Sequence, residues 1–180
     1  MESLRAPTLA EFLVWENAQD GKHEYADGEV IAFAGGTNRH NLIAANVISG
    51  LRTTLGAGCR ATGSDTKIIG SSWSRYPDVV VTCDERDTLD LAHVAHPTLI
   101  AEVLSEGTHG IDREDKLDEY RSLSSLREYL LVDSRRRWIQ IVRRSGDEWV
   151  VSLPIREEAV HCPSLDITLS LDEIYAGTGL

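Results

Sequence analysis

Short runs of apolar, mostly β-branched residues form the clearest pattern in this chain. Two of them lie mid-sequence, Val79–Val81 and Leu99–Leu104, the second apolar except at one position; Pro77 and Pro97 lie just before them. Apolar runs of this length, bounded by prolines, are typical of strands buried on both faces. We therefore predict two core strands here.

Amphipathic segments predict four helices. Thr8, followed three residues later by Glu11, forms the capping-box sequence that starts a helix, and the helical spacing of apolar positions marks the others. The predicted helices span residues 9 to about 20, 39 to 55, 112 to 123 and 171 to 175.

Alternation and turn residues predict further strands. Asp27-Gly28 indicates a hairpin between short strands on either side of it, and Ser145-Gly146-Asp147 indicates a second hairpin. Residues 60–69 are interpreted as one strand. The remaining predicted strands are residues 128–133, 138–142 and 149–153.

Composition is that of an ordinary globular chain. The 180 residues, 42% of them hydrophobic, suffice for a single domain over residues 1–180. No apolar stretch approaches the roughly 18 residues of a membrane helix, and the N-terminus does not resemble a secretory signal. Cys59, Cys83 and Cys162 are scattered without a CxxC pair, which favours a reducing compartment over a disulfide framework or zinc ribbon. We expect a cytoplasmic protein that does not associate with membranes.

Charge limits the partners of the protein. The formal net charge is −11, whereas proteins that bind nucleic acid usually carry a basic surface. A nucleic-acid partner would therefore require local basic patches or a metal ion. Arginines at 135–137 and 143–144 are one candidate patch, although such a cluster is more often a solvated edge that blocks aggregation.

Two carboxylates stand in unusual places. Asp78 precedes the first core strand, and Glu102 lies inside the second. A buried carboxylate is costly unless it is paired or binds a cation. Lys116 falls within the apolar arc of the helix predicted over 112–123, where it either extends along the helix surface or points at these carboxylates. Together the three residues suggest a metal-ion site for phosphate chemistry.

Other polar residues have simpler interpretations. His40 falls on the apolar side of the second predicted helix, where a histidine is more often a hydrogen-bonded core residue than a ligand. From the residues alone, Glu24 and Glu29 are expected to be solvated strand residues.

A series of motifs covers nearly the whole chain. In order they are HEYADGEV at 23–30, the following His40, GSDTKI at 63–68, YPDVVVTCD at 76–84, PTLIAEVLS at 97–105, D-x-x-x-K-x-x-x-Y at 112–120 and EYLLVD at 128–133. Their order and spacing resemble the Uma family, a restriction-endonuclease-like group of the PD-(D/E)XK nuclease superfamily. The resemblance implies an α/β (α+β) fold, with a restriction-endonuclease-like mixed β-sheet flanked by helices and acidic residues clustered at one end.

The resemblance also implies a metal site. Asp78 would be the aspartate of the PD motif, Glu102 the acidic residue of the third motif, and Glu24 a further acidic ligand from the N-terminal region. Under the hypothesis of a nuclease, these oxygens and the carbonyl of Val103 would hold one or two Mg²⁺ ions, or Mn²⁺ in their place.

Two positions depart from the superfamily pattern. Leu104 occupies the lysine position of the E-x-K motif. Lys116 resembles a migrated lysine, and Lys67 is the second candidate. Glu106 stands where the family usually has proline, and it adds negative charge near the proposed site.

Two functions stay open. The first is a Mg²⁺-dependent endonuclease with Asp78, Glu102 and Lys116 as catalytic residues, acting on nucleic acid, DNA first, and expected to form a homodimer. The second is a non-catalytic nucleic-acid- or protein-binding module with a vestigial site, in which the same residues form a buried ion network. The missing lysine, Glu106 and the acidic net charge favour the second function.

Overall fold

The computed structural model describes residues 6–33, 35–105 and 111–180, with the backbone alone at 111–115, and it has a mixed α+β fold. The fold class implied by the resemblance is confirmed. Within the described residues the strands form a six-stranded sheet, a five-stranded sheet and a two-stranded hairpin. No helix of the described part is long and apolar enough to span a bilayer.

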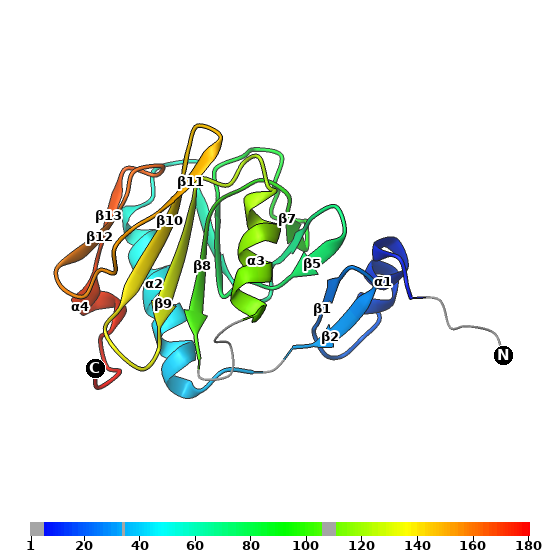
Figure 1. The fold of residues 1–180 in the computed structure, drawn as a ribbon, viewed down its shortest axis with the longest axis horizontal. Helices are drawn as coiled ribbons and strands as arrows, with labels where there is room; N and C mark the ends of the chain where they lie inside the picture. Colours follow the sequence, from blue (N-terminus) through cyan, green and yellow to red (C-terminus); the bar gives the residue numbers. More distant parts are fainter. Residues whose placement is uncertain (1–5, 34, 106–110) are drawn as a thin grey trace.

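The six-stranded sheet forms the centre of the molecule (Figure 1). Its spatial order is β11 (Glu148–Val151), β10 (Ile139–Ser145), β9 (Glu128–Asp133), β8 (Pro97–Leu104), β6 (Val79–Thr82) and β3 (Arg60–Gly63). Only β8 and β9 pair in parallel, and all other neighbours are antiparallel. A parallel pair requires a crossover connection, which α3 (Ile111–Arg121) provides here.

Two helices cover opposite faces of this sheet (Figure 1). α2 (Asn38–Thr54) packs Ile43, Val47 and Leu51 against one face. α3 packs Tyr120 against the other face, which includes Ile100. Alternation along β8 therefore directs Glu102 to the α3 side of the sheet.

The five-stranded sheet lies toward the N-terminal end of the molecule (Figure 1). Its order is β2 (Glu29–Ala32), β1 (His23–Ala26), β5 (Trp73–Arg75), β4 (Lys67–Ile69) and β7 (His93–Val94). α1 (Leu9–Glu16) packs Phe12 against Tyr25 of β1, with ring centroids 5.1 Å apart. The capping box of Thr8 and Glu11 is confirmed, and so is the hairpin at Asp27-Gly28.

Two predictions need correction, and one element was not predicted. Residues 60–69 are not one strand, because a turn at 64–66 sends β3 and β4 into different sheets. The first helix ends at Glu16 rather than near residue 20, since this side chain turns inward and accepts hydrogen bonds from His23 and Tyr76. A C-terminal hairpin, β12 (Ala159–Cys162) and β13 (Ile167–Ser170), was not predicted; with α4 (Leu171–Ile174) it packs in the same core as α2.

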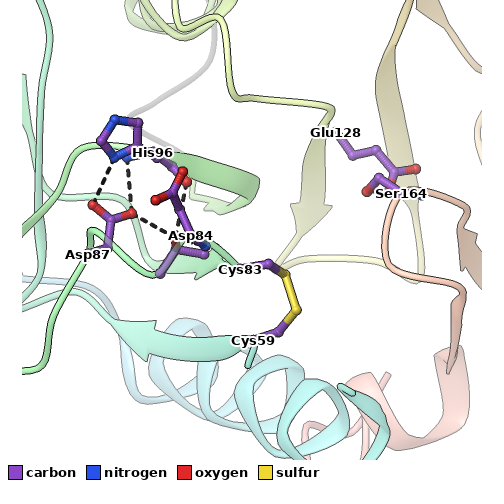
Figure 2. Close-up of a disulfide and its surroundings, with 8 residues drawn as sticks. Cys59, Cys83, Asp84, Asp87, His96, Glu128 and Ser164 are labelled. Atoms are coloured by element: carbon purple, nitrogen blue, oxygen red, sulfur yellow. Dashed lines mark hydrogen bonds and ion pairs between the residues drawn. A yellow bond between two sulfur atoms is a disulfide. The ribbon is translucent and has the colours of Figure 1, made fainter. Parts of the chain in front are cut away.

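The cysteine prediction is also wrong. Cys59 and Cys83 form a disulfide (Figure 2), while Cys162 is free and buried. The antiparallel register pairs Arg60 with Thr82, so the ladder brings the next two residues opposite each other, which spacing along the chain does not reveal. The expectation of a reducing compartment rested on free thiols and loses that support.

Candidate active site

Asp78 sits one residue before β6 and is buried. The register pairs Val79 with Ala101, so the next step of the ladder places Asp78 opposite Glu102. Its Oδ2 accepts a 2.7 Å hydrogen bond from the Val103 backbone N–H. This contact fixes the carboxylate between the two central strands.

His40 approaches the same oxygen from α2. Its Nε2 lies 3.1 Å from Asp78 Oδ2. The hydrogen bond to Asp78 raises the pKa of His40, against the opposing effect of burial. His40 is hydrogen-bonded as expected, but it is half-buried rather than part of the core, and its partner is a candidate site carboxylate.

Glu102 lies on β8 under α3, where Tyr120 donates a 2.8 Å hydrogen bond to its Oε1. Burial, together with the charges of Asp78 and Glu24, raises the pKa of Glu102 to about 7, while Lys116 acts in the opposite direction. A carboxylate with this pKa gains strongly from a nearby cation.

Lys116 reaches the carboxylates from α3. Its Nζ lies 3.5 Å from Glu102 Oε1 and 3.4 Å from Glu24 Oε1, and its side chain is 21% exposed. Lys67, the second candidate, instead donates to Asn17 Oδ1 at 2.9 Å. Of the two lysines, the structure brings Lys116 to the carboxylates.

Glu24 is 5% exposed, so the sequence interpretation as a solvated residue is wrong for Glu24, whereas Glu29 is exposed as expected. Glu24 Oε1 accepts from the Tyr76 N–H at 3.0 Å, and Oε2 accepts from Arg75 Nη1 at 3.1 Å. The residues of β1 gave no sign of this, because the pairing of β1 with β5, which brings Arg75 and Tyr76 to Glu24, was not predicted.

Arg75 is the residue that sequence reasoning missed. It is 6% exposed and also donates to Glu119 of α3, with Nε and Nη2 each 2.7 Å from a carboxylate oxygen. Its only signal in the sequence is its place three residues before Asp78. Glu106 and the side chain of Asp112 lie outside the described residues.

The carboxylates can be tested against the implied metal ion. Among the described residues, the donors to Asp78 lie at Oδ2 and the donors to Glu102 lie at Oε1, which leaves Asp78 Oδ1 and Glu102 Oε2 open to a cation. In the described part of the chain, no three His, Cys, Asp or Glu side chains are grouped to hold a metal. Mg²⁺ is commonly held by one or two carboxylates plus waters and substrate phosphates, so Asp78 and Glu102 fit such an ion.

Comparison with known proteins agrees with the motifs. The family model of Uma2, described as "Putative restriction endonuclease", matches residues 9–172. Two uncharacterized proteins of Synechocystis sp. are each 34% identical to this chain; one alignment covers 93% of this chain and 90% of the relative, the other 84% and 89%. A crystal structure from Anabaena variabilis, titled as a "putative nuclease belonging to DUF820", superposes with a TM-score of 0.75 at 19% identity, over 96% of this chain and 99% of that one.

Proposed function

The chain belongs to the Uma2 family, described as "Putative restriction endonuclease", and from that premise we propose that it is a metal-dependent nuclease whose centre is Asp78, Glu102 and Lys116. The observation that carries the proposal is the convergence of these residues from β6, β8 and α3 at one buried point. The proposed substrate is nucleic acid, with DNA tested first, and the proposed assembly is a homodimer.

Asp78 and Glu102 would hold the divalent cation, Mg²⁺ or Mn²⁺, through their open oxygens, with the Val103 carbonyl as a further ligand. A bound cation of this kind acidifies water and offsets charge on the phosphate. The Val103 N–H and His40 fix the orientation of Asp78, while Tyr120 fixes that of Glu102.

Lys116 would contact the substrate phosphate or the attacking water. Its ammonium is a compact charge with three donors, and it lies on the side of Glu102 that faces α3. Its partial exposure leaves room for a ligand to reach it.

Cleavage of supercoiled plasmid tests the proposal. We expect the wild type to nick plasmid with Mg²⁺ or Mn²⁺ and not with chelator. Asp78→Asn and Glu102→Gln should each lower the rate by at least roughly 100-fold, because each removes one of two proposed cation ligands. Asp118→Asn on α3, whose side chain is 80% exposed, is the matched control and should retain full activity. Metal-dependent cleavage that survives both site substitutions would refute the proposal.

A binding module with a vestigial site is the second candidate. One observation favours it: each site carboxylate already has a cationic or imidazole partner within the protein, Asp78 with His40, Glu102 with Lys116 and Glu24 with Arg75. Titration calorimetry with Mn²⁺ separates the two. Binding that Asp78→Asn abolishes supports the nuclease, and no binding supports the module.

A further inference from the structure

We propose that Glu24 is a positioning residue and not a metal ligand. Arg75 binds Glu24 and Glu119 together, and this group of three residues, termed the Arg75 clamp, holds Lys116 beside Glu102. That Glu24 does not ligate the metal rests on the proposed function. That the Arg75 clamp holds Lys116 does not depend on it.

The first observation is that both oxygens of Glu24 are occupied. Oε1 receives the Tyr76 N–H and lies 3.4 Å from Lys116 Nζ, while Oε2 receives Arg75. A cation at Glu24 would share these oxygens with their donors and would lie next to the positive charges of Arg75 and Lys116. Such like-charge contact is unfavourable in a buried setting.

The second observation is the geometry of Arg75. A guanidinium presents a rigid planar fork of donors and is always charged. Here two of its nitrogens bind Glu119 side by side at 2.7 Å, and a third binds Glu24 at 3.1 Å. One buried side chain thus connects β1, β5 and α3.

The third observation is the placement of Lys116 relative to this fork. Glu119 follows Lys116 by three residues in α3, so both side chains lie on neighbouring positions of one helix face. Arg75 holds α3 in place through Glu119. Glu24 of β1 contacts the ammonium group at the end of the Lys116 side chain. The ammonium is thereby held between two carboxylates.

This arrangement leaves Asp78 and Glu102 as the described carboxylates with an open oxygen at the site. We therefore infer that Asp78 and Glu102 are the ligands among the described carboxylates, and that Glu24 has a separate role in orienting the lysine.

The decisive variant is Glu24→Gln, which keeps the shape and acceptor oxygen but removes the charge. We expect an unchanged Mn²⁺ stoichiometry and a Kd within about 3-fold of the wild type, because the cation does not touch residue 24. We expect kcat for plasmid nicking to fall by roughly 10-fold or more with little change in KM, because a supporting contact is lost. Glu29→Gln, an exposed carboxylate on the same hairpin, is the matched control and should change neither value.

A third readout needs neither metal nor activity. The Lys116 side-chain NMR signal can be assigned because it is absent from the spectrum of Lys116→Arg. In the metal-free protein, relaxation of this signal should show greater mobility in Glu24→Gln than in the wild type. Glu119→Gln is the second variant if Glu24→Gln folds poorly, and it should also loosen Lys116. A circular dichroism spectrum unchanged from wild type confirms that each variant is folded.

The outcomes are distinct. A Mn²⁺ Kd weakened by about 10-fold or more, or a reduced stoichiometry, in Glu24→Gln would overturn the inference and make Glu24 a ligand. If the wild type neither binds metal nor cleaves plasmid, the proposed function fails. The mobility of the Lys116 side chain then remains as the test of the Arg75 clamp. In that case a more mobile Lys116 in Glu24→Gln supports the clamp, and an unchanged Lys116 overturns it.

Discussion

Asp87 is a buried carboxylate outside the candidate site that shows how one residue can organise a loop. It accepts hydrogen bonds from Thr82 Oγ1 at 2.6 Å, from the Ala95 N–H at 2.8 Å and from His96 (Figure 2). Burial opposes the charged form, but these hydrogen bonds outweigh it and lower the pKa of Asp87 below its ordinary value of 3.8. The ionised carboxylate therefore stabilises the folded state.

A lowered pKa in the folded state stabilises the protein above the ordinary pKa, and this stabilisation is lost as the pH falls through the folded value. Asp87→Asn should therefore cost about 2 kcal/mol at pH 7 and progressively less below about pH 4. Urea unfolding at pH 7 and pH 3 measures this, with the exposed Asp90→Asn as control. An equal cost at both pH values would contradict the role of the charge.

Single residues also show what the sequence could and could not predict. The costly positions of Asp78 and Glu102 in apolar strands were visible as a pattern, and the structure places both in the interior. The burial of Glu24 and Arg75 was not visible in the sequence, because it depends on a pairing of β1 with β5, about fifty residues apart. Local alternation carries no information about such a contact.

At the scale of elements, the disulfide ties the edge strand β3 to β6. It joins Cys59 to Cys83, which are 24 positions apart. Closing a loop of that length should stabilise the fold by about 3 kcal/mol, chiefly by restricting the unfolded chain.

Urea unfolding of the oxidised protein, the reduced protein and the double variant Cys59→Ser/Cys83→Ser tests this. The oxidised form should be the more stable by about 3 kcal/mol, and a reductant should have no effect on the double variant. Equal stability of the oxidised and reduced wild type, or three titratable thiols in the denatured unreduced protein, would show that the disulfide does not form.

Elements with strong local signals were predicted well, and those defined by distant partners were not. The capping box set the start of α1, and the apolar runs located β6, β8 and β9. The hairpin of β12 and β13 was not predicted, because each strand has only four residues and alternation over so short a stretch is a weak signal. The break between β3 and β4 escaped because a short polar turn resembles a polar stretch of strand.

At the scale of the whole molecule, the net charge of −11 is not relieved by a free basic surface in the C-terminal arginine cluster. Arg135 and Arg136 bind Asp133, and Arg143 binds Glu128. Arg137 pairs with Asp172, and Arg144 donates to backbone carbonyls after α3. These contacts offset part of the positive charge of the cluster, and its interpretation as a solvated edge rather than a phosphate track stays a prediction.

DNA binding should consequently depend on divalent cations. In chelator we expect weak affinity for a duplex and a slope of log K against log salt smaller than about 3 in magnitude, because few phosphates meet free cationic side chains. Adding Ca²⁺, which takes oxygen ligands, should raise the affinity by roughly 10-fold or more, as judged by fluorescence anisotropy. The double variant Asp78→Asn/Glu102→Gln should lose this increase. Tight binding in chelator with a steep salt slope would contradict the expectation.

Short connections join the two sheets, and the one between β5 and β6 links two parts of the site. Arg75 ends β5 of the five-stranded sheet, and Asp78 stands directly before β6 of the six-stranded sheet, with Tyr76 and Pro77 between them. One inserted or deleted residue at this point would change the position of Arg75 relative to Asp78 while leaving the strands of both sheets intact. The number of residues in this connection therefore determines how the two parts of the site are spaced.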